Sequence, residues 1–404
     1  MSQSIESRYG NFRIVRIARR QERFDIKIVI GITINWANMK RSSRRNFLKS
    51  SAVGVAAAAS TQAFSQSPNL SKKTIAEVRA LEAKEIQKTT SGWNDGLAHP
   101  IPYKNPPGKG KDRAIVLGGG SEYMSSFLVG YFHAMLTNGI DLRLADIVVG
   151  TSAGAVLGSA LLGSRLDLFS AEFNLLADYP KIMAKLVPTK KFSPSQERVM
   201  KMGLTAKDGN PDTIQAIGHA AMAARSIPSD KFQVNMKVFL GDMKTIPKKM
   251  YITTIDCYTA ERLVIAPDTG VSVIDACAAS ASAPGVTGPT WVKDRVCMDG
   301  SIGSTETHCD IVAGSRRALV VALADTIQQE KEGLRLNHLP NTILQEVKDL
   351  EAGGTKTKLV VVGMLPGRKT MSVVDPEIME PAIKYGYERG MQDLPEMKRF
   401  WMSA

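Results

Sequence analysis

The residue best placed for covalent chemistry is Ser152, at the centre of a Gly-Thr-Ser-Ala-Gly segment that runs from Gly150 to Gly154. Mostly apolar residues precede it at 145–149 and follow it at 155–162, which predicts a strand, a sharp turn and a helix. In that setting the turn presents the serine hydroxyl at the end of a sheet, and the helix N-terminus behind it favours negative charge. Both glycines are needed because the turn brings backbones too close for a Cβ atom. Ser152 is therefore a candidate nucleophile, with Gly150 and Gly154 as its elbow.

A serine nucleophile needs hydrogen-bond donors for the oxyanion that its attack creates. Gly118, Gly119 and Gly120 follow a predicted strand at 113–117, and parallel strands bring such a loop and the elbow to one edge of the sheet. We therefore expect the three glycines to form an oxyanion hole. The alternative is a dinucleotide or phosphate loop, but Tyr123 stands where the third glycine of that motif belongs, and no Gly-Lys-Ser/Thr occurs.

The usual base for a serine nucleophile is histidine, and the chain has five. Only His308 and His338 come late enough for the Ser…Asp…His order that α/β-hydrolases use. Neither follows a predicted strand, and each is expected to be a surface histidine. Asp299 does follow such an apolar run, and Gly300 frees the chain after it. Aspartate acting directly on Ser152 is the simpler pairing, with a Ser-His-Asp triad through one of the two histidines as the alternative.

The elements that must position these residues alternate along the chain. Apolar runs predict strands at 113–117, 147–149, 249–255, 263–266, 296–298, 317–323 and 358–364, and periodic segments predict helices at 127–135, 155–162, 271–279, 342–350 and 376–391. This alternation indicates an α/β fold with three layers, α/β/α, around a mostly parallel central sheet. The methionine-rich region 165–246 is either an adaptable lid or helix core, and helix core is the commoner origin of such a pattern.

The net charge of +13 does not indicate a nucleic-acid-binding surface. Residues 1–65 hold 12 Lys and Arg against 3 Asp and Glu, a balance of +9, and the remaining 40 against 36 give only +4. No basic stripe with interleaved aromatic residues occurs, so we expect no nucleic-acid partner. The four cysteines form no Cys-x-x-Cys pair and fit no zinc spacing, so we expect buried free thiols and no metal, with one disulfide as the alternative in an exported protein.

The N-terminal residues resemble an export signal. Ser-Arg-Arg-Asn-Phe-Leu-Lys at 43–49 resembles the twin-arginine motif at every position of its consensus, and a short apolar run and small residues follow in the order of a signal peptide. We expect a signal peptide at 39–65, read by the twin-arginine export machinery, and a periplasmic or secreted mature protein. Because Met39 opens this signal, we expect residues 1–38 to be an upstream extension from a start codon assigned too early.

With these motifs in their order, the chain from Arg113 to about Leu394 resembles a bacterial patatin-like phospholipase. The resemblance is carried by the glycine segment 117–120, the elbow 150–154, the small-residue segment 279–284 that ends in proline, and Met-Asp-Gly at 298–300. It implies a patatin-like hydrolase domain over 111–404, which we expect a helix and a surface loop at 66–110 to precede.

The resemblance also implies roles for individual residues. Ser152 would be the nucleophile and Asp299 the base, with no histidine, and the reaction would pass through an acyl-enzyme without metal or cofactor. Two positions depart from the family pattern: Glu122 lies close after the glycines, and Ser301 follows the Asp-Gly pair. A carboxylate of Glu122 that pointed inward would oppose an oxyanion.

We therefore expect a lipid acyl hydrolase of the phospholipase A, lysophospholipase or carboxylesterase type that uses a Ser-Asp dyad. Its expected partners are a lipid or phospholipid substrate and a membrane surface that it contacts peripherally. The alternatives are a Ser-His-Asp esterase and, from a different class, a non-catalytic lipid-binding protein on the same fold.

Overall fold

The computed structural model describes residues 94–179, 181–182, 192–303, 305, 307–325, 333–334, 337 and 339–402. The predicted upstream extension, signal peptide and first helix of the mature chain lie outside the described residues, and so does His338. Those four predictions remain predictions.

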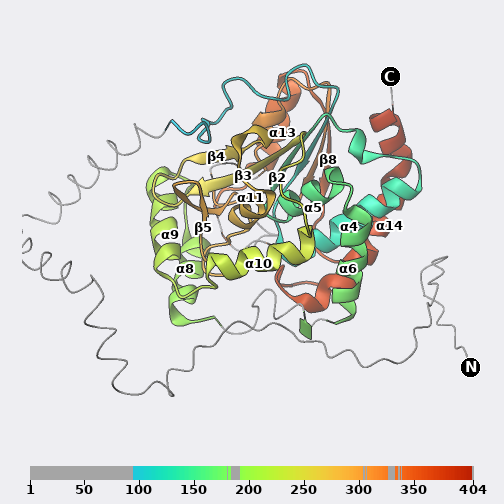
Figure 1. Cartoon of the computed structure of the whole chain (residues 1–404). Coiled ribbons are helices and arrows are strands. Elements are labelled where there is room, and N and C mark those ends of the chain that lie inside the picture. Colours follow the sequence, from blue (N-terminus) through green and yellow to red (C-terminus); the bar gives the residue numbers. More distant parts are fainter. Residues whose placement is uncertain are drawn as a thin grey trace, which may run out of the picture. The chain divides into compact units, whose positions relative to one another are not determined.

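The centre of the domain is one mixed sheet with the strand order β5-β6-β3-β2-β1-β7-β8, and β4 pairs with β3 (Figure 1). Five neighbouring strands run parallel: β3 (Met250–Asp256), β2 (Ile147–Thr151), β1 (Arg113–Leu117), β7 (Arg317–Ala322) and β8 (Lys356–Val361). The antiparallel strands are β4 (Arg262–Ile265), β5 (Thr290–Val292) and β6 (Arg295–Asp299). The prediction of a mostly parallel α/β sheet is confirmed.

Both faces of the sheet are covered, which explains why its central strands are nearly continuous apolar runs. On β1, Ile115 and Leu117 belong to one hydrophobic core, whereas Ala114 and Val116 belong to a second core on the opposite face. Side chains alternate along a strand, so each strand supplies both cores.

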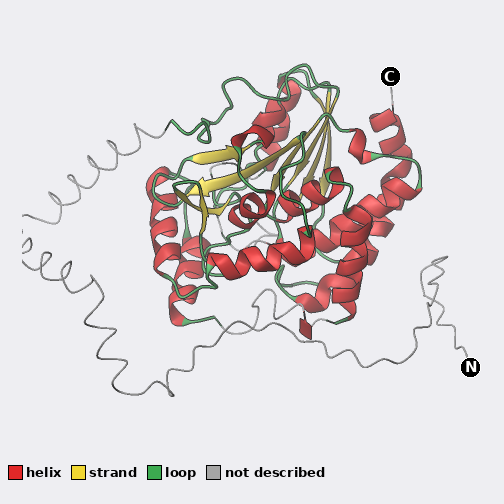
Figure 2. Cartoon of the chain, viewed as in Figure 1, coloured by secondary structure: helices red, strands yellow, loops and turns green. Residues whose placement is uncertain are grey.

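Helices form the two outer layers (Figure 2). The thicker layer contains α4 (Ser121–Thr137), α5 (Ala153–Leu162), α6 (Leu166–Asp178), α10 (Ser229–Leu240), α11 (Val273–Ser280) and α14 (Met379–Met402). On the other face lie the short helix η5 (Cys309–Val312) and α13 (Ile343–Ala352). The remaining short helices are η3 (Leu142–Leu144), η4 (Pro267–Thr269) and η7 (Pro376–Ile378).

The methionine-rich region is built from helices. Besides α6 and α10 it contains α8 (Pro194–Thr205) and α9 (Pro211–Ala223), which lie beyond β5 and β3 in Figure 1. Ile214 and Ile217 of α9 pack in a third core with Ile255 of β3. Within the part of the chain that the structure describes, no helix has the length and apolarity needed to cross a bilayer.

The C-terminal helix α14 packs along α4 (Figure 1). The two backbones touch, because a Cβ atom added at Gly386 would lie 2.1 Å from the carbonyl oxygen of Phe127. The helix is longer than the predicted segment 376–391 and continues to Met402, with Trp401 fully buried. This contact fixes the position of α4, which begins at Ser121 directly after the glycine loop.

Candidate active site

Ser152 occupies the sharp turn that the sequence predicts, between the end of β2 and the start of α5. Its φ of 53° is left-handed, a conformation that is strained for a serine and typical of functional turns. A Cβ at Gly154 would lie 2.2 Å from the carbonyl oxygen of Leu117, and one at Gly150 would lie 2.5 Å from that of Gly154. Only glycine fits at these two positions, so the structure has the predicted elbow.

A second hydroxyl fixes the elbow. The backbone N–H of Ser152 donates to Ser280 Oγ at 2.8 Å, and that hydroxyl donates to the carbonyl oxygen of Thr253 at 2.7 Å. Ser280 ends α11, is fully buried and belongs to the small-residue segment 279–284. The sequence showed this segment but not the role of its serine.

Asp299 ends β6, on the far side of β3 from Ser152. In the sheet register Thr151 pairs with Thr253 and Thr254 pairs with Asp299, so the two functional residues lie at nearly the same level. Gly300 is required after it, because a Cβ there would lie 2.6 Å from the carbonyl oxygen of Thr253. The predicted strand before Asp299 is present, and Asp299 is its last residue.

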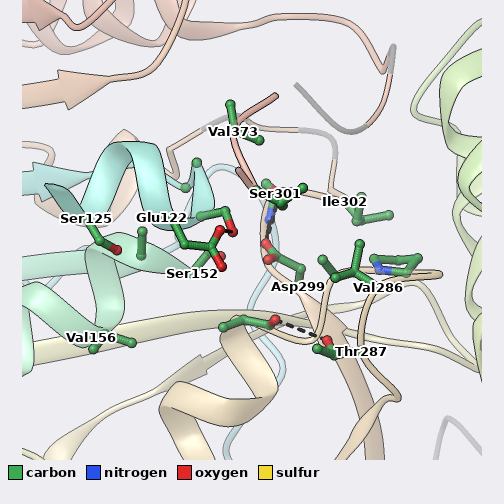
Figure 3. A pocket seen from close by; sticks show the side chains of 18 of the residues that line it. Glu122, Ser125, Ser152, Val156, Val286, Thr287, Asp299, Ser301, Ile302 and Val373 are labelled. Atoms are coloured by element: carbon green, nitrogen blue, oxygen red, sulfur yellow. Dashed lines mark hydrogen bonds between the residues drawn. The ribbon is translucent and has the colours of Figure 1, made fainter. Parts of the chain in front are cut away.

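The Asp299 carboxyl group is buried and well supplied with donors. Ser301 donates to its Oδ1 twice, from the backbone N–H at 2.9 Å and from the hydroxyl at 2.7 Å (Figure 3). Burial raises the pKa of Asp299, and hydrogen bonds from Ser301 and from the Ser152 side chain oppose that rise. Ser301, the departure from the family pattern, thus supports the charged form of the aspartate.

The glycine loop contributes fewer donors than the sequence suggested. The N–H of Gly118 donates to the carbonyl oxygen of Val321 at 2.9 Å, which extends the pairing of β1 with β7. Gly118 is therefore removed from the predicted donor set. The N–H groups of Gly119 and Gly120 have no acceptor among the described residues, and a Cβ at Gly119 would lie 3.3 Å from Ser152 Cβ.

The residue after the nucleophile adds a donor that the sequence argument missed. Ala153 is the first residue of α5, lines the same cavity as Ser152, and its N–H has no acceptor among the described residues. The residue after a nucleophilic serine commonly supplies such a donor, so the elbow motif itself was the available signal. Gly119, Gly120 and Ala153 are the candidate oxyanion donors.

His308 is not the surface histidine that the sequence suggested. The ring is fully buried, with Nδ1 at 2.6 Å from Thr305 Oγ1 and Nε2 donating to the carbonyl oxygen of Gly300 at 3.0 Å. Burial lowers its pKa to about 4, so the ring is neutral at pH 7. Both ring nitrogens have hydrogen-bond partners, and His308 does not line the cavity. Its role is therefore structural: it holds the backbone at Gly300, next to Asp299.

We expect the double variant His308→Gln, His338→Gln to be less stable but still active. Loss of the two buried hydrogen bonds of His308 costs about 1–3 kcal/mol of unfolding free energy. The kcat/KM of the folded protein should stay within about tenfold of wild type, whereas a lost triad base costs about 10⁴-fold. Urea unfolding and ester hydrolysis measure the two quantities. A loss of about 10⁴-fold in kcat/KM without a change in the unfolding midpoint would instead support the Ser-His-Asp alternative.

Ser152 and Asp299 open on one cavity with mostly apolar walls (Figure 3). Helices α6, α8, α9 and α10 supply much of the wall, with the side chains of Phe169, Phe173, Val199, Met200, Ile217, Phe232, Met236 and Phe239. The methionine-rich region therefore forms a wall of the site. Among the described residues that line the cavity, only Glu122 and Asp299 are ionisable.

The four cysteines are buried free thiols, as predicted. Among the residues that the structure describes, no group of three His, Cys, Asp or Glu side chains could hold a metal ion. The cavity lining likewise contains no basic side chain among those described residues.

Residues 115–306 match the family model for patatin-like phospholipase. The matched segment contains the glycine loop, Ser152 and Asp299, together with the strands β2, β3 and β6 of the sheet. No curated protein matches the chain.

Solved structures give distant similarities. VipD from Legionella pneumophila aligns at 11% sequence identity with a TM-score of 0.33, covering 74% of this chain and 70% of that one. The heterodimeric ExoU–SpcU complex from the type III secretion system of Pseudomonas aeruginosa aligns at 16% identity with a TM-score of 0.29, covering 74% of this chain and 53% of that one.

The patatin-like segment does not contain the whole cavity. Leu323 after β7, Leu334, Asn337, Val373 and Val374 also line it, and all five follow residue 306. The segment after the family match thus supplies one wall of the site.

Proposed function

We propose that this chain is a lipid acyl hydrolase in which Ser152 attacks an ester carbonyl carbon and Asp299 accepts the hydroxyl proton. The observation that carries the proposal is the buried Ser152–Asp299 pair at the end of an apolar cavity, within a segment that matches the patatin-like phospholipase model. The carboxylate stabilised by Ser301 is a base that needs no histidine.

The proposed reaction has two halves. Ser152 Oγ forms a bond to the carbonyl carbon while its proton passes to Asp299, and the N–H groups of Gly119, Gly120 and Ala153 stabilise the oxyanion. The tetrahedral intermediate collapses, and the alcohol leaves with the proton from Asp299. Water then attacks the acyl-enzyme with Asp299 again as base, which releases the carboxylic acid and restores the serine.

The cavity walls favour a substrate with a long acyl chain. Phenylalanine, methionine and aliphatic side chains gain free energy by contact with methylene groups, about 0.8 kcal/mol for each buried CH₂. No described lining residue is basic, so nothing in this part of the cavity pairs with a phosphate group. We infer that the cavity holds the acyl chain and that the head group of a lipid lies toward its mouth.

A chain-length series tests the proposed function. Hydrolysis of p-nitrophenyl esters from acetate to palmitate should rise with acyl length and should stop after treatment with a fluorophosphonate, which phosphonylates activated serines with loss of fluoride. The untreated and treated samples of one preparation are the matched pair. If they hydrolyse every ester at the same rate, the protein is not a serine hydrolase, and the non-catalytic lipid-binding alternative gains.

Filling the cavity should shorten the preferred acyl chain. Met236 of α10 is 5% exposed and lines the cavity, so Met236→Trp removes room for the distal methylene groups. We expect kcat/KM for palmitate esters to fall about tenfold or more, with butyrate esters little changed. Val234→Trp, on the same helix but 59% exposed, is the control that should leave the profile unchanged. An equal loss for all chain lengths would contradict this acyl site.

A further inference from the structure

Glu122 is a buried carboxyl group that the dyad does not use. It lies in the first turn of α4, directly after the glycine loop, and is only 3% exposed. It lines the same cavity as Ser152, Ser301 and Asp299, and in Figure 3 its carboxyl group points into that cavity on the side of Ser152. The inward direction that would oppose an oxyanion is therefore the observed one.

The two carboxyl groups of the cavity have different hydrogen bonding. Asp299 accepts from the Ser301 N–H and the Ser301 hydroxyl, and both hydrogen bonds favour a carboxylate. Glu122 Oε2 accepts from the Ser121 hydroxyl, but its Oε1 is buried without a hydrogen-bond partner among the described residues. A buried oxygen without a donor favours the neutral acid, because ionisation there would leave the charge unsolvated.

The charges around Glu122 act in the same direction. Burial, together with the charge of Asp375, raises the pKa of Glu122 to about 7, although hydrogen bonds from Ser121 and from its own backbone lower it. Asp299 across the cavity is also acidic, and no described lining residue is basic. Glu122 therefore favours the neutral acid below about pH 7, whereas the Ser301 hydrogen bonds favour the carboxylate of Asp299. In enzyme active sites, two carboxyl groups whose pKa values are shifted apart by their environments commonly serve as the base and the acid.

We propose that Glu122 keeps its proton and donates a hydrogen bond from its free carboxyl oxygen to the ester carbonyl oxygen as negative charge develops there. This inference rests on the proposed function. Glu122 would act beside the N–H groups of Gly119, Gly120 and Ala153, and the proton stays on Glu122 throughout. An ionised Glu122 would repel the oxyanion. In its neutral form the same carboxyl group is a hydrogen-bond donor that stabilises the oxyanion.

The test is the pH dependence of kcat/KM, which reports the free enzyme. With p-nitrophenyl octanoate, wild type should lose activity about tenfold per pH unit above about pH 7, as Glu122 ionises. Glu122→Gln keeps a donor that cannot ionise, so it should retain activity near pH 6 and exceed wild type about 100-fold near pH 9. Glu122→Leu has no donor and should lose about 10²-fold near pH 6.

The outcomes separate this inference from the function beneath it. Two results would overturn the donor role of Glu122 but leave the proposed hydrolase function intact. One is a loss of kcat/KM above pH 7 in Glu122→Gln that equals the loss in wild type, and the other is full activity of Glu122→Leu near pH 6. If fluorophosphonate treatment changes no rate in wild type, the hydrolase itself fails.

Thermal unfolding adds a readout that does not need activity. A folded-state pKa above the unfolded value gives stability that is present at low pH and lost as pH rises through about 7. Wild type should therefore lose Tm relative to Glu122→Gln as pH rises from about 4.5 to about 8. A carboxylate that merely caps α4 would give the opposite trend, and that result would overturn the inference.

Discussion

Replacing Ser152 with alanine should lower kcat/KM for a long-chain acyl ester by about 10⁴-fold or more, because the substitution removes the atom that forms the acyl-enzyme. The fold should persist, since the Ser152 N–H that donates to Ser280 is a backbone group and survives. Residual catalysis above water would come from the oxyanion donors and from binding alone. Hydrolysis rates and the mass of the fluorophosphonate-treated protein are the two measurements.

A serine on the wall of the same cavity provides the control. Ser125 of α4 lines the cavity one turn beyond Ser121, and the described residues show no hydrogen bond from its side chain to the elbow, so Ser125→Ala should keep both the activity and the mass shift. Retained labelling in Ser152→Ala would mean that another serine is the nucleophile. Loss of activity in both variants would indicate general damage to the cavity.

The second large effect is expected for Asp299→Asn, at about 10³- to 10⁴-fold in kcat/KM, because an amide cannot accept the serine proton. Asparagine keeps the shape of the side chain, and its oxygen can still accept the two Ser301 hydrogen bonds. The loss should therefore lie in kcat, with little change in Tm. Wild type should lose activity at acidic pH as Asp299 becomes protonated, and the residual activity of the variant should lack that fall.

Asp294 supplies a matched aspartate for this experiment. It lies in the exposed turn between β5 and β6, five positions before Asp299, and does not line the cavity. Asp294→Asn should match wild type throughout. If Asp299→Asn retained activity within about tenfold of wild type, the base would be another group, and the Ser-His-Asp alternative would need His338.

Much of the site could be predicted because its parts are local motifs at strand ends. The elbow at 150–154 needs only its own glycines and the strand and helix beside it, and Asp299 needs only β6 and Gly300. The parallel strands β1 and β2 bring the glycine loop and the elbow to one edge of the sheet. Strand β6 runs antiparallel to β3, so Asp299 comes to the level of the elbow through its pairing with Thr254, which the sequence did not predict. Of the residues that the sequence predicted for the site, Gly119, Gly120, Ser152 and Asp299 line one cavity.

The rest depends on contacts between distant segments. Gly118 is no free donor because β7, about two hundred positions later, takes its N–H, and no pattern near Gly118 encodes that pairing. His308 is buried because its ring hydrogen-bonds the backbone just after Asp299. The direction of Glu122 follows from α4, whose first turn also donates from the Tyr123 N–H to the carbonyl oxygen of Val373. Each fact requires the assembled sheet.

The pairing of β1 with β7 also determines where the protein can be divided. A fragment cut to the family match at 115–306 would lose β7 and β8 and leave β1 as an open edge, with unpaired N–H and carbonyl groups that invite aggregation. It would also uncover the face of α4 that touches Gly386. We therefore expect the smallest fragment that folds to extend to the end of α14, well beyond the segment that matches the family model.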